Sequence, residues 1–269
     1  MESKYNKLND KKWLHQKYVI EGKGTNRIAN IVGCKAANSV RQALIRHNIS
    51  VRNISNGLTY NRKDDFLLSD VALQIIIGSL LGDGFLRKHN KYSDNSYPYF
   101  AKRNKFKDHV EYVAQNIFTD HFNKYISVDI NINFGKRLVY HIIRTHVQKS
   151  LLDLYKRWYP ENNYFKKIVP KDIELTPIVL LNWFMDDGNS YRRKRKTRQI
   201  IITFCAESFT SQDQLWLIDE MQNKYGISCS LRNVKFGTGC RIEIKQSYAD
   251  IFYDIIGKCP VPSMKYKWK

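Results

Sequence analysis

The sequence predicts an α+β protein of two similar halves, preceded by a small all-helical module. An apolar helix that stops on aspartate and glycine occurs twice, as IIIGSLLGDG at 75–84 and VLLNWFMDDG at 179–188. The same order of patterns follows each one: strand, long amphipathic helix, two strands, closing helix. Repetition of such a mixed unit predicts a pseudo-symmetric α+β fold. We expect the helical module at 1–55, a polar, turn-rich linker at 56–68, and the two halves at 69–169 and 170–269.

The N-terminal module has apolar residues at helical spacing. Thr25 is expected to cap a short helix that Gly33 ends, because threonine favours helix starts and glycine favours helix ends. A further helix is expected over 36–47, with Ile45 facing inward. The pattern therefore predicts a compact bundle of short helices.

The spacing of Ala29, Gly33 and Val40 resembles that of a helix-turn-helix, with a turn one residue longer than usual. The resemblance implies that the helix after Gly33 enters a groove of DNA. Side chains suited to base edges and phosphates then lie on or near its exposed face: Asn38, Ser39, Arg41, Gln42 and Arg46. An ordinary helical bundle with a solvated polar face is the alternative.

Periodicity and spacing justify the elements of each half. In the first half, alternation predicts strands at 97–103, 126–132 and 137–146, and helical spacing predicts helices from 107 and 147. In the second half, the strands are predicted at 198–207, 227–234 and 240–245, with helices from 211 and 246. Each long helix begins 24 residues after the aspartate of its half, at Lys107 and Ser211. This matching spacing supports two copies of one unit.

The strongest signal in the composition is charge. The chain has 45 Lys and Arg against 25 Asp and Glu, a formal net charge of +20. A polyanionic partner is expected, because each neutralised phosphate releases counterions and adds affinity. The basic residues are spread along the whole chain, which disfavours binding to a membrane surface through one amphipathic helix. Nucleic acid is therefore the expected partner.

The remaining composition points to a protein inside the cell. No apolar run approaches the roughly 20 residues that cross a bilayer, and the polar N-terminal segment is unlike a signal peptide. The five cysteines form no CxxC pair, which disfavours a zinc knuckle or a disulfide framework. We expect no membrane partner and no secretion, and a location in the cytoplasm or nucleoid of a bacterial or phage-infected cell, or in an organelle.

Both apolar helices end on a carboxylate, Asp83 in the first half and Asp187 in the second. A carboxylate at a helix C-terminus is unfavourable unless a cation compensates the charge. Two such helix ends side by side would form an all-oxygen site suited to Mg²⁺. Gly78 and Gly82 lie four residues apart on one helix face, so another helix backbone could approach there. In a basic protein this arrangement points to hydrolysis of phosphodiester bonds.

The segments IIGSLLGDG (76–84) and LLNWFMDDG (180–188) resemble the two motifs of LAGLIDADG homing endonucleases, in their single-chain, I-SceI-like form. The resemblance covers 69–269 and implies two αββαββα repeats that form a DNA-binding saddle. It also implies that each motif helix packs at the interface of the repeats and delivers one metal-binding aspartate, here Asp83 and Asp187. Main-chain carbonyls near Gly82 and Asp186 would complete the metal site. The second motif departs from the small-residue pattern, because Asn182 and Asp186 stand where the first motif has Gly78 and Gly82.

The resemblance also implies a basic residue near each active centre. The segment KKIVP (166–170) supplies Lys167, and VPSMKYKW (261–268) supplies Lys267. The two lysines follow the aspartates of their halves at similar distances, 84 and 80 residues. Each could stabilise charge on the attacked phosphate or orient the attacking water. A surface position in a lysine-rich chain is the alternative for each.

The sheets of the resembling family lie in the major groove, and the basic loop YRRKRKTR (191–198) would lie over the duplex. Alternation along strands selects a face but does not assign bases. The expected DNA contacts are Arg87, Lys88, Lys102, Arg103, Lys136, Arg137, Arg144, Arg192, Arg193, Arg195, Arg232, Lys235, Arg241 and Lys245.

These observations predict a monomeric, Mg²⁺-dependent endonuclease, with Mn²⁺ as a substitute, that cuts both strands of a long specific DNA target. The resemblance implies cleavage across the minor groove with short 3′ overhangs, and a role in homing of an intron or similar mobile element. Two alternatives stay open: an RNA maturase that binds intron RNA, and a non-catalytic transcription regulator. The intact Asp83 and Asp187 disfavour the regulator.

Overall fold

The computed structural model describes residues 6–34, 36–51, 68–88, 96–118, 125–133, 136–160, 166–192, 200–234 and 239–268. The chain forms two compact units, Met1–Asp65 and Phe66–Lys269. The expected linker, 56–68, lies outside the described residues except for Leu68, so its boundaries stay a prediction. Among the described residues, no helix is both long and apolar enough to span a bilayer.

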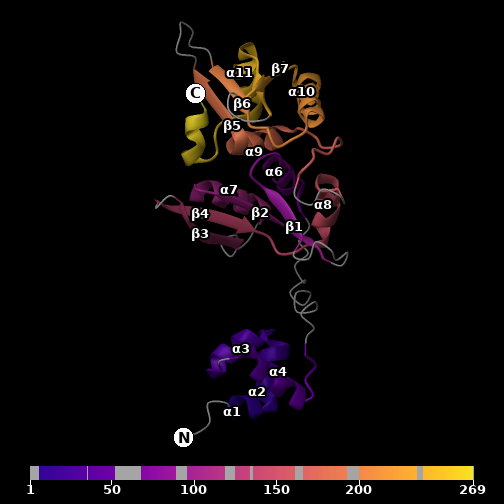
Figure 1. Ribbon diagram of the computed structural model, residues 1–269, viewed down its shortest axis with the longest axis vertical. Helices are drawn as coiled ribbons and strands as arrows, with labels where there is room; N and C mark the ends of the chain where they lie inside the picture. Colours follow the sequence, from indigo (N-terminus) through magenta and orange to yellow (C-terminus); the bar gives the residue numbers. More distant parts are fainter. Residues whose placement is uncertain are drawn as a thin grey trace. The chain divides into compact units, whose positions relative to one another are not determined.

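The described part of the N-terminal unit consists of short helices (Figure 1). They are α1 (Asn6–Asn9), α2 (Lys11–His15), the π-helix η1 (Gln16–Ile20), α3 (Thr25–Val32) and α4 (Ala37–Arg46). Gly33 ends α3 in a left-handed conformation, as predicted. The expected cap is wrong by one residue: Gly24 holds the N-cap position, and Thr25 is already helical. Ile45 is 51% exposed because Val40, Ala43 and Leu44 form the buried face of α4.

The first half of the second unit contains an antiparallel sheet with helices on one face. Its strand order is β1-β2-β4-β3. The elements are α6 (Asp70–Leu81), β1 (Phe85–Lys88), β2 (Pro98–Asn104), α7 (Lys107–Ile117), β3 (Ile126–Asn133), β4 (Lys136–Arg144), η4 (Lys149–Leu151) and α8 (Leu152–Trp158).

The second half repeats this arrangement, with strand order β5-β6-β8-β7. Its elements are α9 (Pro177–Asp187), β5 (Gly188–Arg192), β6 (Ile200–Phe204), α10 (Ser211–Tyr225), β7 (Cys229–Asn233), β8 (Cys240–Ile244), η5 (Gln246–Tyr248), α11 (Ala249–Ile256) and η6 (Pro262–Lys267). The predicted α+β fold of two equivalent repeats is confirmed. The residue patterns alone missed β1 and β5, which are only four and five residues long.

The helices α6 and α9 lie side by side between the two sheets (Figure 1). Each begins at a hydroxyl cap, since Ser69 accepts from the Ala72 amide at 3.1 Å and Thr176 from the Val179 amide at 3.2 Å. Both helices are apolar over most of their surface, and one buried cluster runs through them into both halves. The interface of the two repeats is therefore part of a continuous core.

Glycine makes the close approach of the two helices feasible. A Cβ atom on Gly78 would lie 2.5 Å from the carbonyl oxygen of Val179 and 2.8 Å from Cβ of Asn182. A Cβ atom on Gly82 would lie 2.4 Å from Cβ of Asp186. The larger residues of α9 thus fill the space that the glycines of α6 leave. Close packing is retained although the second motif lacks the small residues of the first.

Candidate active site

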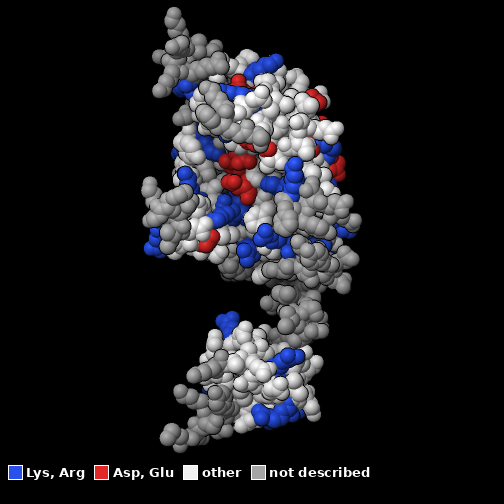
Figure 2. Space-filling view, in the orientation of Figure 1, with Lys and Arg blue, Asp and Glu red and all other residues white. Residues whose placement is uncertain are grey.

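The two predicted aspartates lie at the same end of the helix pair. Asp83 follows the C-terminus of α6, and Asp187 is the last residue of α9. The backbone N–H of Asp83 donates to Oδ2 of Asp186 at 3.3 Å, which joins the two helix ends directly. Burial raises the pKa of Asp187 to about 7, and the nearby charges of Asp83 and Asp186 add to the effect. Figure 2 shows acidic side chains gathered at the middle of this unit, with basic side chains around them.

Lys167 lies at the C-terminal end of α6. Its Nζ donates to the carbonyl oxygens of Leu80, Gly82 and Gly84 at 2.8, 2.7 and 3.0 Å. These carbonyls carry the partial negative charge of the helix end, and the ammonium group compensates it. Burial lowers the pKa of Lys167 to about 8, while the charges of the nearby aspartates oppose that decrease.

Lys267 makes the equivalent contacts in the second half. Its Nζ donates to the carbonyl oxygens of Phe184, Met185 and Asp186 at 3.2, 2.6 and 2.8 Å. Burial also lowers the pKa of this lysine. Each repeat therefore places one lysine on the end of its own motif helix. A direct role of Lys167 and Lys267 on the attacked phosphate stays a prediction.

Asp186 is held differently from its neighbour. Its side chain is fully buried and forms an ion pair with Lys102, Nζ to Oδ1 2.6 Å. The Nε2 atom of His109 lies 3.6 Å from the same oxygen and 3.3 Å from Nζ of Lys102. Burial lowers the pKa of His109 well below its usual value, so this ring is neutral near pH 7. The carboxylate of Asp186 therefore makes its contacts with other groups inside the protein.

The expectation that Lys102 contacts DNA is wrong, because its side chain is 0% exposed. Strand alternation is the reason. Lys102 and Phe100 are two positions apart in β2, so their side chains lie on the same face of the sheet. Phe100 is also fully buried, and both side chains point toward the helix layer. The same alternation in the sequence segment YPYFAKR could have shown this position to be internal.

The donor set suits a hard divalent cation. No three His, Cys, Asp or Glu side chains within the described ranges gather closely enough to hold a metal ion. The oxygens available are instead the carboxylates of Asp83 and Asp187 and the carbonyls of Gly82 and Asp186. Each of those carbonyls accepts one lysine hydrogen bond and keeps a second lone pair. Burial first, and then the charges of Asp83 and Asp186, raise the pKa of Asp187, and a cation bound between these carboxylates would oppose that rise.

The first sheet carries part of the expected basic surface. The strand pairing places Arg87, Arg103 and Arg144 on one face. Arg103 contacts Asp129 at 3.2 Å and lies over the ring of Tyr140 at 3.8 Å. Two further expected contacts, Lys88 and Arg137, lie on the opposite face of the sheet, which is the face of Lys102. Lys88 lies over the ring of Tyr155 at 5.3 Å, so alternation separates these two from the common surface.

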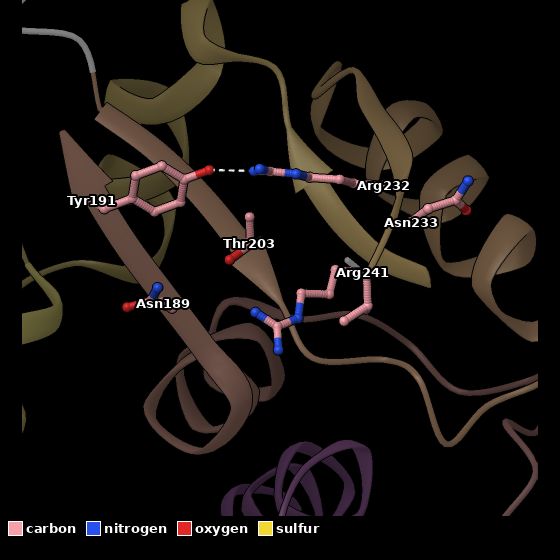
Figure 3. A pocket seen from close by; sticks show the side chains of 7 residues that line it. Asn189, Tyr191, Thr203, Arg232, Asn233 and Arg241 are labelled. Carbon is pink, nitrogen blue, oxygen red and sulfur yellow. Dashed lines mark hydrogen bonds between the residues drawn. The ribbon is translucent and has the colours of Figure 1, made fainter. Parts of the chain in front are cut away.

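The second sheet forms a hollow of about 320 Å³ on the corresponding face (Figure 3). Arg232 donates to the hydroxyl of Tyr191 and to Glu243, the latter at 2.9 Å. Arg241 donates to Glu207 at 2.7 Å. The hollow is lined by Asn189, Tyr191, Thr203, Arg232, Asn233, Val234 and Arg241. Sequence reasoning missed the uncharged members because it searched for basic residues alone.

The other expected DNA contacts have mixed outcomes. Lys245 is exposed on the face of Arg241, and Arg192 is exposed at the end of β5. Three residues, Arg193, Arg195 and Lys235, lie outside the described residues, as does the side chain of Lys136. In the N-terminal unit the expected face of α4 is exposed, namely Asn38, Ser39, Arg41, Gln42 and Arg46, the last of which donates to Asn9 at 3.1 Å. DNA binding by this helix stays a prediction.

Comparison with known families agrees with the fold and the paired helix ends. The chain belongs to the LAGLIDADG DNA endonuclease family, because the model of that family matches residues 73–252, more than half of the chain. The match includes residues 73–81 of α6, all of α9 and both sheets. The resemblance inferred from the two motifs is therefore confirmed.

Individual relatives include both endonucleases and maturases. The probable intron-encoded endonuclease 1 of Wickerhamomyces canadensis is 24% identical over 209 residues, covering 74% of this chain and 84% of the relative. Cytochrome b mRNA maturase bI2 of Saccharomyces cerevisiae is 27% identical over 212 residues, covering 72% of this chain but only 46% of the maturase. The structure of the homing endonuclease I-WcaI bound to its DNA recognition sequence matches with a TM-score of 0.68 at 23% identity, covering 82% of this chain and 96% of that one. This last likeness shows a shared fold.

Proposed function

We propose that this protein is a site-specific double-strand DNA endonuclease that uses a divalent metal ion and acts as a monomer. The observation that carries the proposal is the pair of symmetric helix ends, each with one aspartate and one lysine: Asp83 with Lys167, and Asp187 with Lys267. One chain thus supplies two equivalent sets of groups, as cleavage of two antiparallel strands requires. No second protomer is needed to complete either set.

Mg²⁺ is the proposed metal, with Mn²⁺ as a substitute. Asp83 and Asp187 would hold it, together with the main-chain carbonyls of Gly82 and Asp186. When bound, such an ion lowers the pKa of a coordinated water and stabilises the leaving oxygen. Lys167 and Lys267 would keep the helix ends rigid and add positive charge close to the reacting phosphates.

Recognition of the target would use the faces of the two sheets that carry Arg87, Arg103, Arg232 and Arg241. Arginine suits guanine edges and phosphates, and the polar side chains around it suit other bases. The solved relative I-WcaI is bound to its DNA recognition sequence, which supports a long specific target here. The helix α4 of the N-terminal unit would add contacts beyond those of the sheets.

The relationship to cytochrome b mRNA maturases supports a second candidate, binding of intron RNA. This chain is 27% and 26% identical to two such maturases, and 24% identical to the endonuclease relative. A non-catalytic regulator is disfavoured, because such a role does not need paired aspartates and lysines at the helix ends. A role in homing of an intron or another mobile element follows from the endonuclease proposal.

Mapping of cleavage sites tests the proposal. The protein is incubated with a randomised plasmid library and Mg²⁺, and the sequences at new DNA ends are determined. Asp83→Asn and Asp187→Asn should abolish double-strand cleavage while keeping DNA affinity in a gel-shift assay with Ca²⁺. Full cutting by either variant would rule out the assigned centre. A tighter gel shift on intron RNA than on the DNA target, without cleavage, would favour the maturase.

A further inference from the structure

One buried ion pair crosses the boundary between the two repeats. Asp186 belongs to α9 in the second repeat, whereas Lys102 belongs to β2 in the first. Both side chains are 0% exposed, and their charged atoms are 2.6 Å apart. Fully buried charges are rare unless paired, because desolvation is costly. Packing alone therefore does not explain why a buried ion pair stands here, since apolar side chains would fill the space at a lower desolvation cost.

The contacts of the pair converge on the backbone around Asp83. Oδ1 of Asp186 faces Lys102, and Oδ2 accepts the N–H of Asp83 at 3.3 Å. Lys102 also donates to Oγ of Ser79, in the last turn of α6, at 3.3 Å. The main chain of Asp186 is itself fixed, because Lys267 donates to its carbonyl oxygen at 2.8 Å. The pair thus links a fixed point of the second repeat to the aspartate of the first.

Among the described residues, the second repeat has no equivalent of this link. Gly82 stands where the second motif has Asp186, so no carboxylate reaches back from the first repeat. Strand register shows which residue corresponds to Lys102. Phe85, two residues after Asp83, pairs with Ala101, and Asn189, two residues after Asp187, pairs with Thr203. The next residue in each strand is Lys102 in β2 and Phe204 in β6, so Phe204 holds the position of Lys102. Phe204 packs on aromatic rings of α9, with its ring centroid 4.2 Å from that of Trp183. The backbone of Asp83 therefore has a support that Asp187 lacks.

We infer that Asp186 and Lys102 are positioning residues that set the backbone of Asp83, so that the two strands of the DNA target depend on them unequally. This inference rests on the proposed endonuclease function. Asp186 supplies the acceptor for the Asp83 amide, and Lys102 holds that acceptor in place. Loss of the acceptor should slow the strand whose cleavage depends on Asp83 more than the other strand.

Two double variants separate positioning from simple stability. Lys102→Met with Asp186→Asn and Lys102→Met with Asp186→Leu both remove the buried charges and keep a branched side chain at position 186. Only the first keeps an oxygen that accepts the Asp83 amide. On a target labelled at both ends, the leucine variant should accumulate nicked product, with one strand slowed roughly tenfold or more relative to the other. The asparagine variant should keep a strand ratio near that of the wild type.

Hydrogen–deuterium exchange of the segment 80–84 gives a second readout that requires neither metal nor cleavage. Exchange there should be faster in the leucine variant than in the asparagine variant, because only the former frees the Asp83 amide. Lys171→Met is the control: it removes a half-exposed ion pair with Asp213 and should change neither measurement. Thermal unfolding of all variants verifies that they fold.

The possible outcomes are distinct. Equal strand ratios and equal exchange in the two double variants would overturn the positioning role. If the wild type cuts no DNA, the endonuclease proposal fails, but exchange at 80–84 still decides whether Asp186 holds the Asp83 amide. A wild type that cuts and a leucine variant that slows both strands equally would also contradict the inference.

Discussion

Asp186 of α9 fills the space that Gly82 of α6 leaves open, although the two residues hold corresponding positions in their repeats. A Cβ atom on Gly82 would lie 2.4 Å from Cβ of Asp186, far inside contact distance. The close approach of the two helix ends depends on this absence of a side chain, and with it the electrostatic interaction of Asp83 with Asp187.

Gly82→Ala should therefore destabilise the second unit by about 1–3 kcal/mol or more, because the helices must separate. Urea unfolding followed by Trp fluorescence measures the change. Gly24→Ala in the N-terminal unit is the control, since a Cβ atom on Gly24 would meet nothing within 4 Å and its φ is −72°. A stability of Gly82→Ala equal to that of the control would contradict this account of the interface.

Lys167→Met should remove the ammonium group from three carbonyl oxygens at the end of α6. Unpaired buried acceptors cost about 1–3 kcal/mol, and the helix end should become more mobile. We expect lower stability and much slower cleavage, measured by thermal unfolding and by plasmid linearisation. The neighbouring Lys166→Met is a matched control because Lys166 is exposed. Similar losses in both variants would argue for a general effect of charge.

Lys267→Met should have the corresponding effect on α9, and the two lysines are expected to be equivalent. Exposed Lys265 provides the control in this half. The comparison of the strand-specific rates of Lys167→Met and Lys267→Met is informative. If Lys167→Met mainly slows cleavage of one DNA strand and Lys267→Met mainly slows cleavage of the other, then each lysine acts at the active centre of its own repeat.

The raised pKa of Asp187 leads us to expect that the free energy of unfolding depends on pH in the absence of metal. Its pKa in the folded protein is about 7, above the usual 3.8, so the folded state binds the proton more tightly than the unfolded state. The resulting stability is fully present below about pH 4 and is lost as the pH rises toward 7 and above. The difference of about three pKa units corresponds to a contribution of about 4 kcal/mol.

Chemical unfolding with EDTA, from pH 4 to pH 8, measures this effect as the difference between the wild type and Asp187→Asn. The asparagine variant should lack the contribution. Addition of Mg²⁺ at pH 8 should raise the stability of the wild type and not that of Asp187→Asn. A difference between the two proteins that does not change with pH would refute the assignment.

Arg232 and Arg241 are expected to contribute to target recognition through the second sheet. Arg232→Ala should weaken binding to the selected target by about 1–3 kcal/mol and relax base preference at one position. Competition gel shifts in Ca²⁺ with single-base variants of the target measure both effects. Arg157→Ala, on α8, is the control, and an equal loss there would indicate a general loss of positive charge.

The exposed face of α4 gives the last prediction. Replacing Arg41 and Gln42 by alanine should weaken DNA binding and reduce its salt dependence by about one unit of slope if Arg41 contacts a phosphate. Lys11→Ala, in α2, is the control. Unchanged affinity and salt dependence in the double variant would leave the N-terminal unit without a role in DNA binding.

Much of the fold and part of the site could be predicted from the sequence because the chain repeats itself. Asp83 and Asp187, and then Lys167 and Lys267, have matching places in two copies, and the structure brings each group to its helix end. The role of Asp186 could not be predicted, since its partner Lys102 is distant in sequence and lysine usually lies at the surface. Uncharged residues of the second sheet were missed because charge alone does not mark a recognition surface.

The unequal helix interface has a consequence for how the two halves can associate. Two copies of α6 facing each other would lack the Asn182 and Asp186 side chains that pack against the glycine positions in this interface. Two copies of α9 would bring two Asp186 carboxylates into one dry space, with a steric overlap and a strong repulsion. Each repeat is complementary to the other and lacks complementarity to itself. Separation of the halves into independent proteins should therefore yield a heterodimer that reassembles only when both are present, and no homodimer of either.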